Sequence, residues 1–186
     1  MKISTGKGDI GSTSLLFGER IHKTSEYVCA CGAVDELNAL LGMVRAREEA
    51  SPEMRELIFQ VQKRLSCLMT ELMVLPSEWN SPKKRTLSQI SQEDISFLDS
   101  SIESYESSLP IFKEWLIPGD NELEAVLNFA RTVCRRAERE LWFLAKEFEN
   151  TPAQSQFNRL PVYLNRLSDL LWLMTLSARI VSTKQE

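Results

Sequence analysis

Residues 121–148 read NELEAVLNFARTVCRRAERELWFLAKEF, and this stretch decides the fold. Apolar side chains recur in it every three or four residues, as they do on the buried face of an amphipathic helix. At about 100° per residue, one apolar stripe contains Leu127, Ala130, Cys134, Ala137, Leu141 and Phe148. A narrow stripe next to it carries Arg131, Arg135 and Glu138, with Arg139 beside that stripe. The pattern predicts a long helix with one face in a core and a charged stripe along the edge of that core.

Four more helices are predicted outward from this one. Apolar periodicity places them at about 27–47, from Ser51 to about 73, from Ser91 to about 105, and at about 161–181. Ser51 and Ser91 are typical N-cap residues. No stretch alternates apolar and polar residues clearly enough to predict a strand. We therefore expect an all-α fold, a five-helix antiparallel bundle with a glycine-rich N-terminal loop. It forms one domain over residues 1–186, with the loop at 1–26 and the bundle at 27–181.

Composition narrows the classes of function that this chain can have. The 186-residue chain carries 22 Lys and Arg against 26 Asp and Glu, a formal net charge of −4. This balance argues against a nucleic-acid partner. No apolar run approaches the roughly 20 residues that cross a bilayer, and the polar N-terminus does not resemble a signal peptide. The four cysteines include one close pair, Cys29-x-Cys31, with no second pair, and His22 is the only histidine. We therefore expect reduced thiols, no protein-bound metal and a cytoplasmic location.

A glycine-rich segment stands near the N-terminus and reads TGKGDIGSTS over residues 5–14. Glycines let the backbone approach a ligand closely and direct N–H groups at an anion. Lys7, Thr13 and Ser14 add a cation and two hydroxyl groups. The segment is not a P-loop, because it lacks the G-x-x-x-x-G-K-[ST] pattern and no predicted strand precedes it. Two interpretations stay open: a phosphate-binding loop, or a flexible terminal tail.

The charged groups of two helices are also open to two interpretations. Arg131 and Arg135 suit a carboxylate or phosphate ligand, because a guanidinium offers a planar fork of donors. They could instead belong to a solvated face on which Arg135 pairs with Glu138. Asp35 lies among small residues on the first predicted helix. It either meets a cationic partner in a close seam or is an exposed carboxylate without a role.

The last predicted helix has a second face. Opposite its leucine stripe it presents Asn165, Asp169, Trp172 and Leu176. Such a mixed face contacts a ligand or another subunit, or the helix is sandwiched within the bundle. Both interpretations stay open on the pattern alone.

Ordered blocks of sequence carry a family resemblance from Thr5 to about Ala178. The blocks are Gly8-Asp9-x-Gly11-x-Thr13-Ser14-Leu15, Gly18-Glu19-Arg20 with Lys23, Gly32-x-Val34-Asp35-Glu36-Leu37-Asn38, Pro118-Gly119, Ala130-Arg131-Thr132-x-x-Arg135-Arg136-Ala137-Glu138-Arg139, and Tyr163-Leu164-Asn165-Arg166-Leu167-Ser168-Asp169. With these blocks the chain resembles the PduO-type ATP:cob(I)alamin adenosyltransferases. The last two blocks are the most specific as a pair.

The resemblance implies a homotrimer of five-helix bundles with ATP bound between subunits. It implies a nucleotide site formed by Thr5, Gly6, Lys7, Gly8, Thr13, Ser14, Lys23, Arg135, Glu138, Arg139 and Asn165. Mg²⁺ would be carried by the phosphates, without a metal ligand from the protein. Asp35 and Arg131 resemble an inter-subunit ion pair beside the corrinoid, and Trp115 stands where the family usually has a phenylalanine that keeps the lower axial position of cobalt empty.

The resemblance also implies a reaction. Reduced cobalt in cob(I)alamin attacks C5′ of ATP, giving adenosylcobalamin and triphosphate, with Arg135, Lys7, Asp35 and Arg131 as the residues that assist. The product could be handed to an adenosylcobalamin-dependent enzyme. Two alternatives remain: a degenerate member that binds ATP or corrinoid without turnover, as a carrier or sensor, and a scaffolding bundle without a ligand.

Several positions depart from the family pattern. Lys7 is shifted by one residue relative to the usual loop, and a second lysine is missing. Asp120 replaces the second glycine that usually follows Pro118-Gly119, and Leu176 stands where an arginine is common. Trp115 is larger than the usual phenylalanine.

Overall fold

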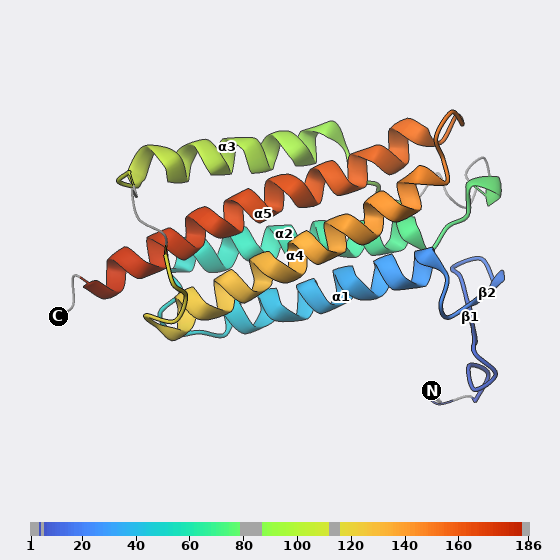
Figure 1. The fold of residues 1–186 in the computed structure, drawn as a ribbon, viewed down its shortest axis with the longest axis horizontal. Coiled ribbons are helices and arrows are strands. Elements are labelled where there is room, and N and C mark those ends of the chain that lie inside the picture. The colour runs from blue at the N-terminus through green and yellow to red at the C-terminus, as the bar shows by residue number, and fades with distance from the viewer. Residues whose placement is uncertain (1–3, 5, 79–86, 112–115, 184–186) are drawn as a thin grey trace.

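A computed structural model describes residues 4, 6–78, 87–111 and 116–183 of the chain. The helices are α1 (Glu26–Arg45), α2 (Pro52–Leu72), α3 (Gln92–Ser108), α4 (Glu122–Lys146) and α5 (Gln154–Thr183), with a short 3-10 turn at Pro76–Glu78. Successive helices run in opposite directions along one bundle axis (Figure 1). The expected antiparallel five-helix bundle is thereby confirmed.

α4 lies at the centre of the bundle and packs against both α1 and α5 (Figure 1). α2 packs on α1, and α3 packs on α5. The stripe expected on α4 is buried in the core, with Leu127, Ala130, Cys134, Ala137 and Leu141 at most 1% exposed. Phe148 is partly buried and stacks on Phe157. This burial removes the apolar stripes of all five helices from water, which is the main stabilisation of such a bundle.

The expectation that the chain contains no strand is wrong for the N-terminal segment. β1 (Ser12–Ser14) and β2 (Arg20–His22) form an antiparallel pair in which Thr13 faces Ile21. Each strand is too short for an alternating pattern to appear in the sequence. The hairpin lies at the end of the bundle where α1 begins (Figure 1).

The start of α5 also differs from the expectation. The helix begins at Gln154, about two turns before Pro161, which lies inside it. A proline inside a helix costs a backbone hydrogen bond, which favours a start at the proline. Here Phe157 and Leu160 are buried in the first two turns, and their packing offsets that cost.

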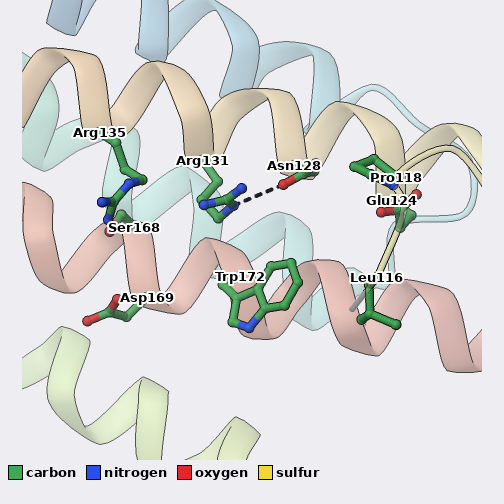
Figure 2. Close-up of a pocket in the computed structure, with 9 residues that line it drawn as sticks. All are labelled: Leu116, Pro118, Glu124, Asn128, Arg131, Arg135, Ser168, Asp169 and Trp172. Carbon is green, nitrogen blue, oxygen red and sulfur yellow. Dashed lines mark hydrogen bonds between the residues drawn. The ribbon is translucent and has the colours of Figure 1, made fainter. Parts of the chain in front are cut away.

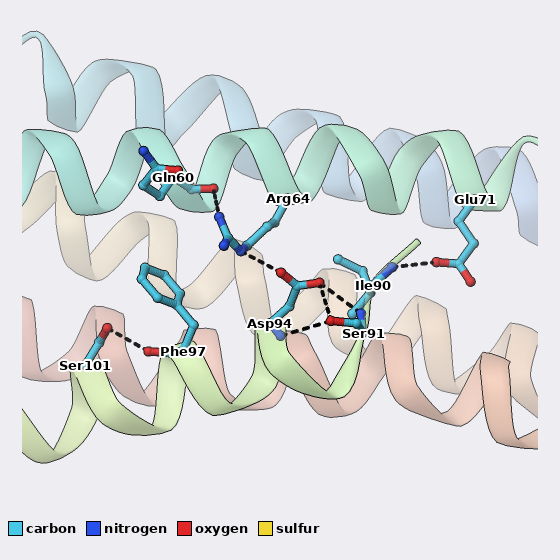
Figure 3. A network of polar contacts seen from close by, with 8 residues as sticks. All are labelled: Gln60, Arg64, Glu71, Ile90, Ser91, Asp94, Phe97 and Ser101. Carbon is cyan, nitrogen blue, oxygen red and sulfur yellow. Dashed lines mark hydrogen bonds and ion pairs between the residues drawn. The ribbon is translucent and has the colours of Figure 1, made fainter. Parts of the chain in front are cut away.

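The first turns of α3 are held against α2 by polar contacts (Figure 3). Arg64 Nε donates to Asp94 Oδ1 at 2.7 Å, and its guanidinium lies 4.6 Å from the Phe97 ring centroid. Ser91 and Asp94 form a capping box at the start of α3. These contacts fix α3 against α2 beside the core.

α1 is, by length and composition only, the one helix in the described part of the chain that could cross a membrane. In the structure its apolar residues Ala30, Val34, Leu37, Leu41 and Val44 are fully buried in the bundle. This is the position of a core helix.

Candidate functional site

A pocket of about 440 Å³ lies between α4 and α5 (Figure 2). It is lined by Leu116, Pro118, Glu124, Asn128, Arg131, Arg135, Ser168, Asp169 and Trp172. The α4 residues of this set recur every three or four positions, so they share one face of the helix. The segment before α4 closes one end of the pocket with Leu116 and Pro118. The pocket therefore has an apolar end and a charged end.

Two guanidinium groups project from α4 toward the pocket. Arg131 Nε donates to Asn128 Oδ1 at 2.9 Å, and its Cζ lies 5.4 Å from the Trp172 ring centroid. Burial, and then the charge of Arg135, lower the pKa of Arg131 below its usual value. Among the described residues, neither arginine has a carboxylate within ion-pairing distance. Two cations held close together without a counter-ion make a site that favours an anion.

The charged stripe of α4 continues one turn beyond the pocket. Asn165 Nδ2 donates to Glu138 Oε1 at 3.3 Å, which joins α5 to α4. Arg139 Nη1 donates to the backbone oxygen of Arg135 at 3.0 Å. The structure therefore brings four of the predicted nucleotide-binding residues, Arg135, Glu138, Arg139 and Asn165, to adjoining positions on two packed helices.

The N-terminal loop is folded around Arg20. Arg20 Nη2 donates to the backbone oxygens of Lys7 at 2.8 Å and Ser12 at 3.3 Å, and it also bonds Ser12 Oγ. Its Nη1 donates to Ser14 Oγ at 3.3 Å. A hydroxyl that accepts from a guanidinium keeps its own proton for another acceptor, so Ser12 and Ser14 can each donate to a ligand.

Two glycines shape this loop. A Cβ at Gly8 would lie 3.1 Å from Lys23 Nζ, so the ammonium group of Lys23 rests across the Gly8 backbone. Gly11 has a φ of 78°, in the left-handed region that favours glycine. The Lys23 side chain thus returns from the end of β2 to the turn that contains Lys7 and Gly8, and Thr13 and Ser14 follow in β1.

Both the sequence and the fold match those of known proteins. A family model described as cobalamin adenosyltransferase matches residues 3–178. The chain belongs to the cobalamin adenosyltransferase family. The corrinoid adenosyltransferase PduO of Citrobacter freundii is 37% identical over 172 residues, which is 92% of this chain and 48% of that protein. The corrinoid adenosyltransferase of Bacillus subtilis is 32% identical over 184 residues, 99% of this chain and 88% of the relative.

A solved structure shares the fold. A variant PduO-type ATP:corrinoid adenosyltransferase from Lactobacillus reuteri, complexed with cobalamin and ATP, superposes with a TM-score of 0.83 at 26% identity, covering 98% of this chain and 93% of that one. The chain spans about half the length of the first curated relatives it matches, the PduO proteins of Citrobacter freundii and Salmonella typhimurium. It covers a larger share, 88%, of the Bacillus subtilis corrinoid adenosyltransferase.

Some residues that the family resemblance groups into one site are not joined by hydrogen bonds or ion pairs within the described part of this chain. Among the described residues, no hydrogen bond or ion pair joins the loop at 6–23 to Arg135, Glu138 or Asn165. Asp35 is exposed on α1, and within the described residues it has no hydrogen bond or ion pair with Arg131. Burial, and then the charge of Asp35, raise the pKa of the nearby Cys31 thiol. Thr5 and Trp115 lie outside the described residues.

The structure adds residues to the site that sequence reasoning missed. Arg20 holds the loop, and Glu124, only 2% exposed, lines the pocket. For Glu124 the sequence does contain a signal, the pattern Asn121-x-x-Glu124 at the start of a helix. An acidic residue three positions after an N-cap often folds back on the preceding backbone. Leu176, expected on an outer mixed face, is 6% exposed. Within the described residues, no cluster of three His, Cys, Asp or Glu side chains could hold a metal ion.

Proposed function

We propose that this protein transfers the 5′-deoxyadenosyl group of ATP to cob(I)alamin, forming adenosylcobalamin and triphosphate. The observation that carries the proposal is the pair Arg131 and Arg135, which form no ion pair with any described residue and lie in a pocket with an apolar end. A corrin ring needs an apolar wall, and a polyphosphate needs unpaired cations. Family membership and the names of the relatives point to the same reaction.

The chemistry asks little acid–base work of the chain. Cobalt(I) is the nucleophile: a Co–C5′ bond forms, the C5′–O bond breaks, and its electron pair leaves with the triphosphate. The reacting metal belongs to the substrate. The residues of the protein orient C5′ and stabilise charge on the leaving group. A chain with one histidine suits such a reaction.

The proposed sites follow from these tasks. Arg135 and Lys7 would stabilise the triphosphate, which carries Mg²⁺ on its oxygens. The wider nucleotide site comprises Thr5, Gly6, Lys7, Gly8, Thr13, Ser14, Lys23, Arg135, Glu138, Arg139 and Asn165. Trp115, Asp35 and Arg131 would contact or frame the corrinoid.

A homotrimer is part of the proposal. Among the described residues, no hydrogen bond or ion pair joins the loop to the nucleotide-site residues of α4 and α5, which supports a site assembled from two copies of the chain. Exposed apolar side chains on the outer faces of α1 and α4 offer area for such a contact: Met43 is 50%, Phe129 is 53% and Phe143 is 60% exposed. Across that interface Asp35 of one copy would meet Arg131 of the next.

A reducing compartment fits the proposal. All four cysteines are free, and Cys29 is exposed. Thiols persist in the cytoplasm, and we propose that this protein acts there. The product, adenosylcobalamin, would serve an enzyme that begins radical chemistry from its Co–C bond.

An anaerobic assay tests the proposed function. Purified protein is mixed with chemically reduced cobalamin and MgATP, and the absorbance change from Co(I) to alkylated Co(III) is followed. We expect rapid, ATP-dependent conversion. A rate equal to the control without enzyme would contradict the proposal. Calorimetric binding of ATP or corrinoid without turnover would instead support a carrier or sensor, a role that the shifted Lys7 and the buried Leu176 favour.

A further inference from the structure

Glu124 is a buried carboxylate in the wall of the α4–α5 pocket. It stands in the first turn of α4 and is 2% exposed. No cation among the described residues forms an ion pair with it. Its Oε2 accepts the backbone N–H of Gly119 at 2.6 Å and that of Asp120 at 3.3 Å. A buried charge is costly unless donors surround it, and here two backbone donors and the positive end of α4 supply that compensation.

The backbone before α4 is shaped to reach this carboxylate. Gly119 has a φ of 117°, a conformation that L side chains rarely adopt. It helps to turn two successive N–H groups toward one oxygen, as in the anion-binding concavities formed by backbone amides. The segment 116–120 therefore depends on a carboxylate at position 124 for its course.

A second set of contacts ties the same segment to the end of α5. Arg179 Nη1 donates to the backbone oxygen of Ile117 at 3.0 Å, and Arg179 also forms an ion pair with Asp120. Asn121 Nδ2 donates to the backbone oxygen of Ala178 at 3.2 Å. The segment is thus fixed from α4 on one side and from α5 on the other.

Leu116 and Pro118 of this segment line the apolar end of the pocket, near Trp172 and Glu124 respectively (Figure 2). We infer that Glu124 and Arg179 are positioning residues that hold the wall formed by Leu116 and Pro118, and so set the affinity for the corrinoid and not for ATP. The inference rests on the proposed function. Glu124 and Arg179 are assigned to the corrinoid because the proposed nucleotide contacts, Arg135 and Asn165, lie on the other side of Arg131 along α4 and α5.

The test compares Glu124→Ala and Glu124→Gln with Glu122→Gln. Glu122 is the matched control: it is also acidic, stands in the same first turn of α4, and pairs with Arg47 instead of the segment. For Glu124→Ala we expect KM for cob(I)alamin to rise roughly tenfold, since charged hydrogen bonds to two amides are lost, with KM for ATP within about twofold of wild type. Glu124→Gln keeps one acceptor and should lie between. Glu122→Gln should leave both KM values unchanged.

Hydrogen exchange gives a readout that does not depend on turnover. Peptides covering 116–121 should exchange roughly tenfold faster in Glu124→Ala than in wild type, and those covering α2 should be unaltered. Arg179→Gln should show the same pattern, and it carries the test if the alanine variant does not fold. Equal rises of KM for ATP and corrinoid, or unchanged exchange at 116–121, would overturn the inference. Absence of turnover by wild type would refute the proposed function, and exchange would still decide whether the contacts hold the segment.

Discussion

At two helix–helix contacts in this bundle, called seams below, an arginine lies beside an aromatic ring, but the polar partners of the two arginines differ. Between α2 and α3, Arg64 lies over Phe97 and bonds Asp94 (Figure 3). Between α4 and α5, Arg131 lies over Trp172, but its side-chain partner is the amide of Asn128 and its charged neighbour is Arg135.

The difference separates stability from binding. The first seam is neutralised internally, so its arginine stabilises the fold and leaves nothing for a ligand. The second seam retains two like charges, which repel each other and cost stability. An anion bound between them would offset that cost. An arginine that lacks a carboxylate partner is therefore the better indicator of a ligand site.

The largest expected effect is on the α2–α3 seam. Arg64→Ala removes a partner of a half-buried ion pair, whose side chains are 27% and 18% exposed. A fully buried pair would lose about 3–5 kcal/mol and an exposed one about 1 or less, so we expect a loss of about 2 kcal/mol in the free energy of unfolding. Denaturant titration measures it. Turnover per folded molecule should be unchanged, and a drop would show that the two seams are coupled.

Arg135→Ala should do the reverse. We expect kcat/KM to fall at least roughly tenfold, about 1.4 kcal/mol, because a cation facing the leaving triphosphate is lost. The free energy of unfolding should stay the same or increase, since repulsion with Arg131 is relieved. Steady-state kinetics and denaturant titration together check both signs. Unchanged kcat/KM would remove Arg135 from the site.

The start of α3 should show a smaller loss. Ser91→Ala removes the cap and breaks the capping box with Asp94, and we expect about 1 kcal/mol less stability. Ser51→Ala, at the start of α2, is the matched control because Ser51 caps by a single bond to the Met54 N–H at 3.2 Å. Its loss should be the smaller of the two. Equal losses would mean that the reciprocal bond from Asp94 contributes nothing.

The smallest change is expected when both partners of the closed pair are replaced. The double variant Arg64→Met with Asp94→Leu should lie within about 1 kcal/mol of wild type, because apolar side chains of similar size can take the place of a half-buried ion pair. Calorimetry gives the melting temperature. A loss larger than that of Arg64→Ala alone would show that Asp94 matters mainly through the cap of α3.

Sequence alone predicted what depends on periodicity. The stripe of α4 and the neighbouring arginines follow from residues three and four apart, and both appear in the structure where expected. The hairpin at 12–22 was missed because three-residue strands carry no pattern. The early start of α5 was missed because proline signals a boundary that local packing overrides. The role of Glu124 depends on where the segment before the helix turns, which spacing along one helix does not encode.

The contact between the N-terminal hairpin and the bundle determines which loop residues can be substituted without affecting the core. Leu15 is buried, and the N–H of Leu16 bonds the backbone oxygen of Met73 at 3.0 Å. Lys7, Thr13 and Ser14, which would meet phosphates, precede that anchor, and Arg20 bonds this part of the loop. Lys7 is exposed, so a substitution there changes nucleotide recognition without disturbing a residue of the core. We expect a lysine shifted by one residue to alter ATP binding and to leave the free energy of unfolding nearly unchanged.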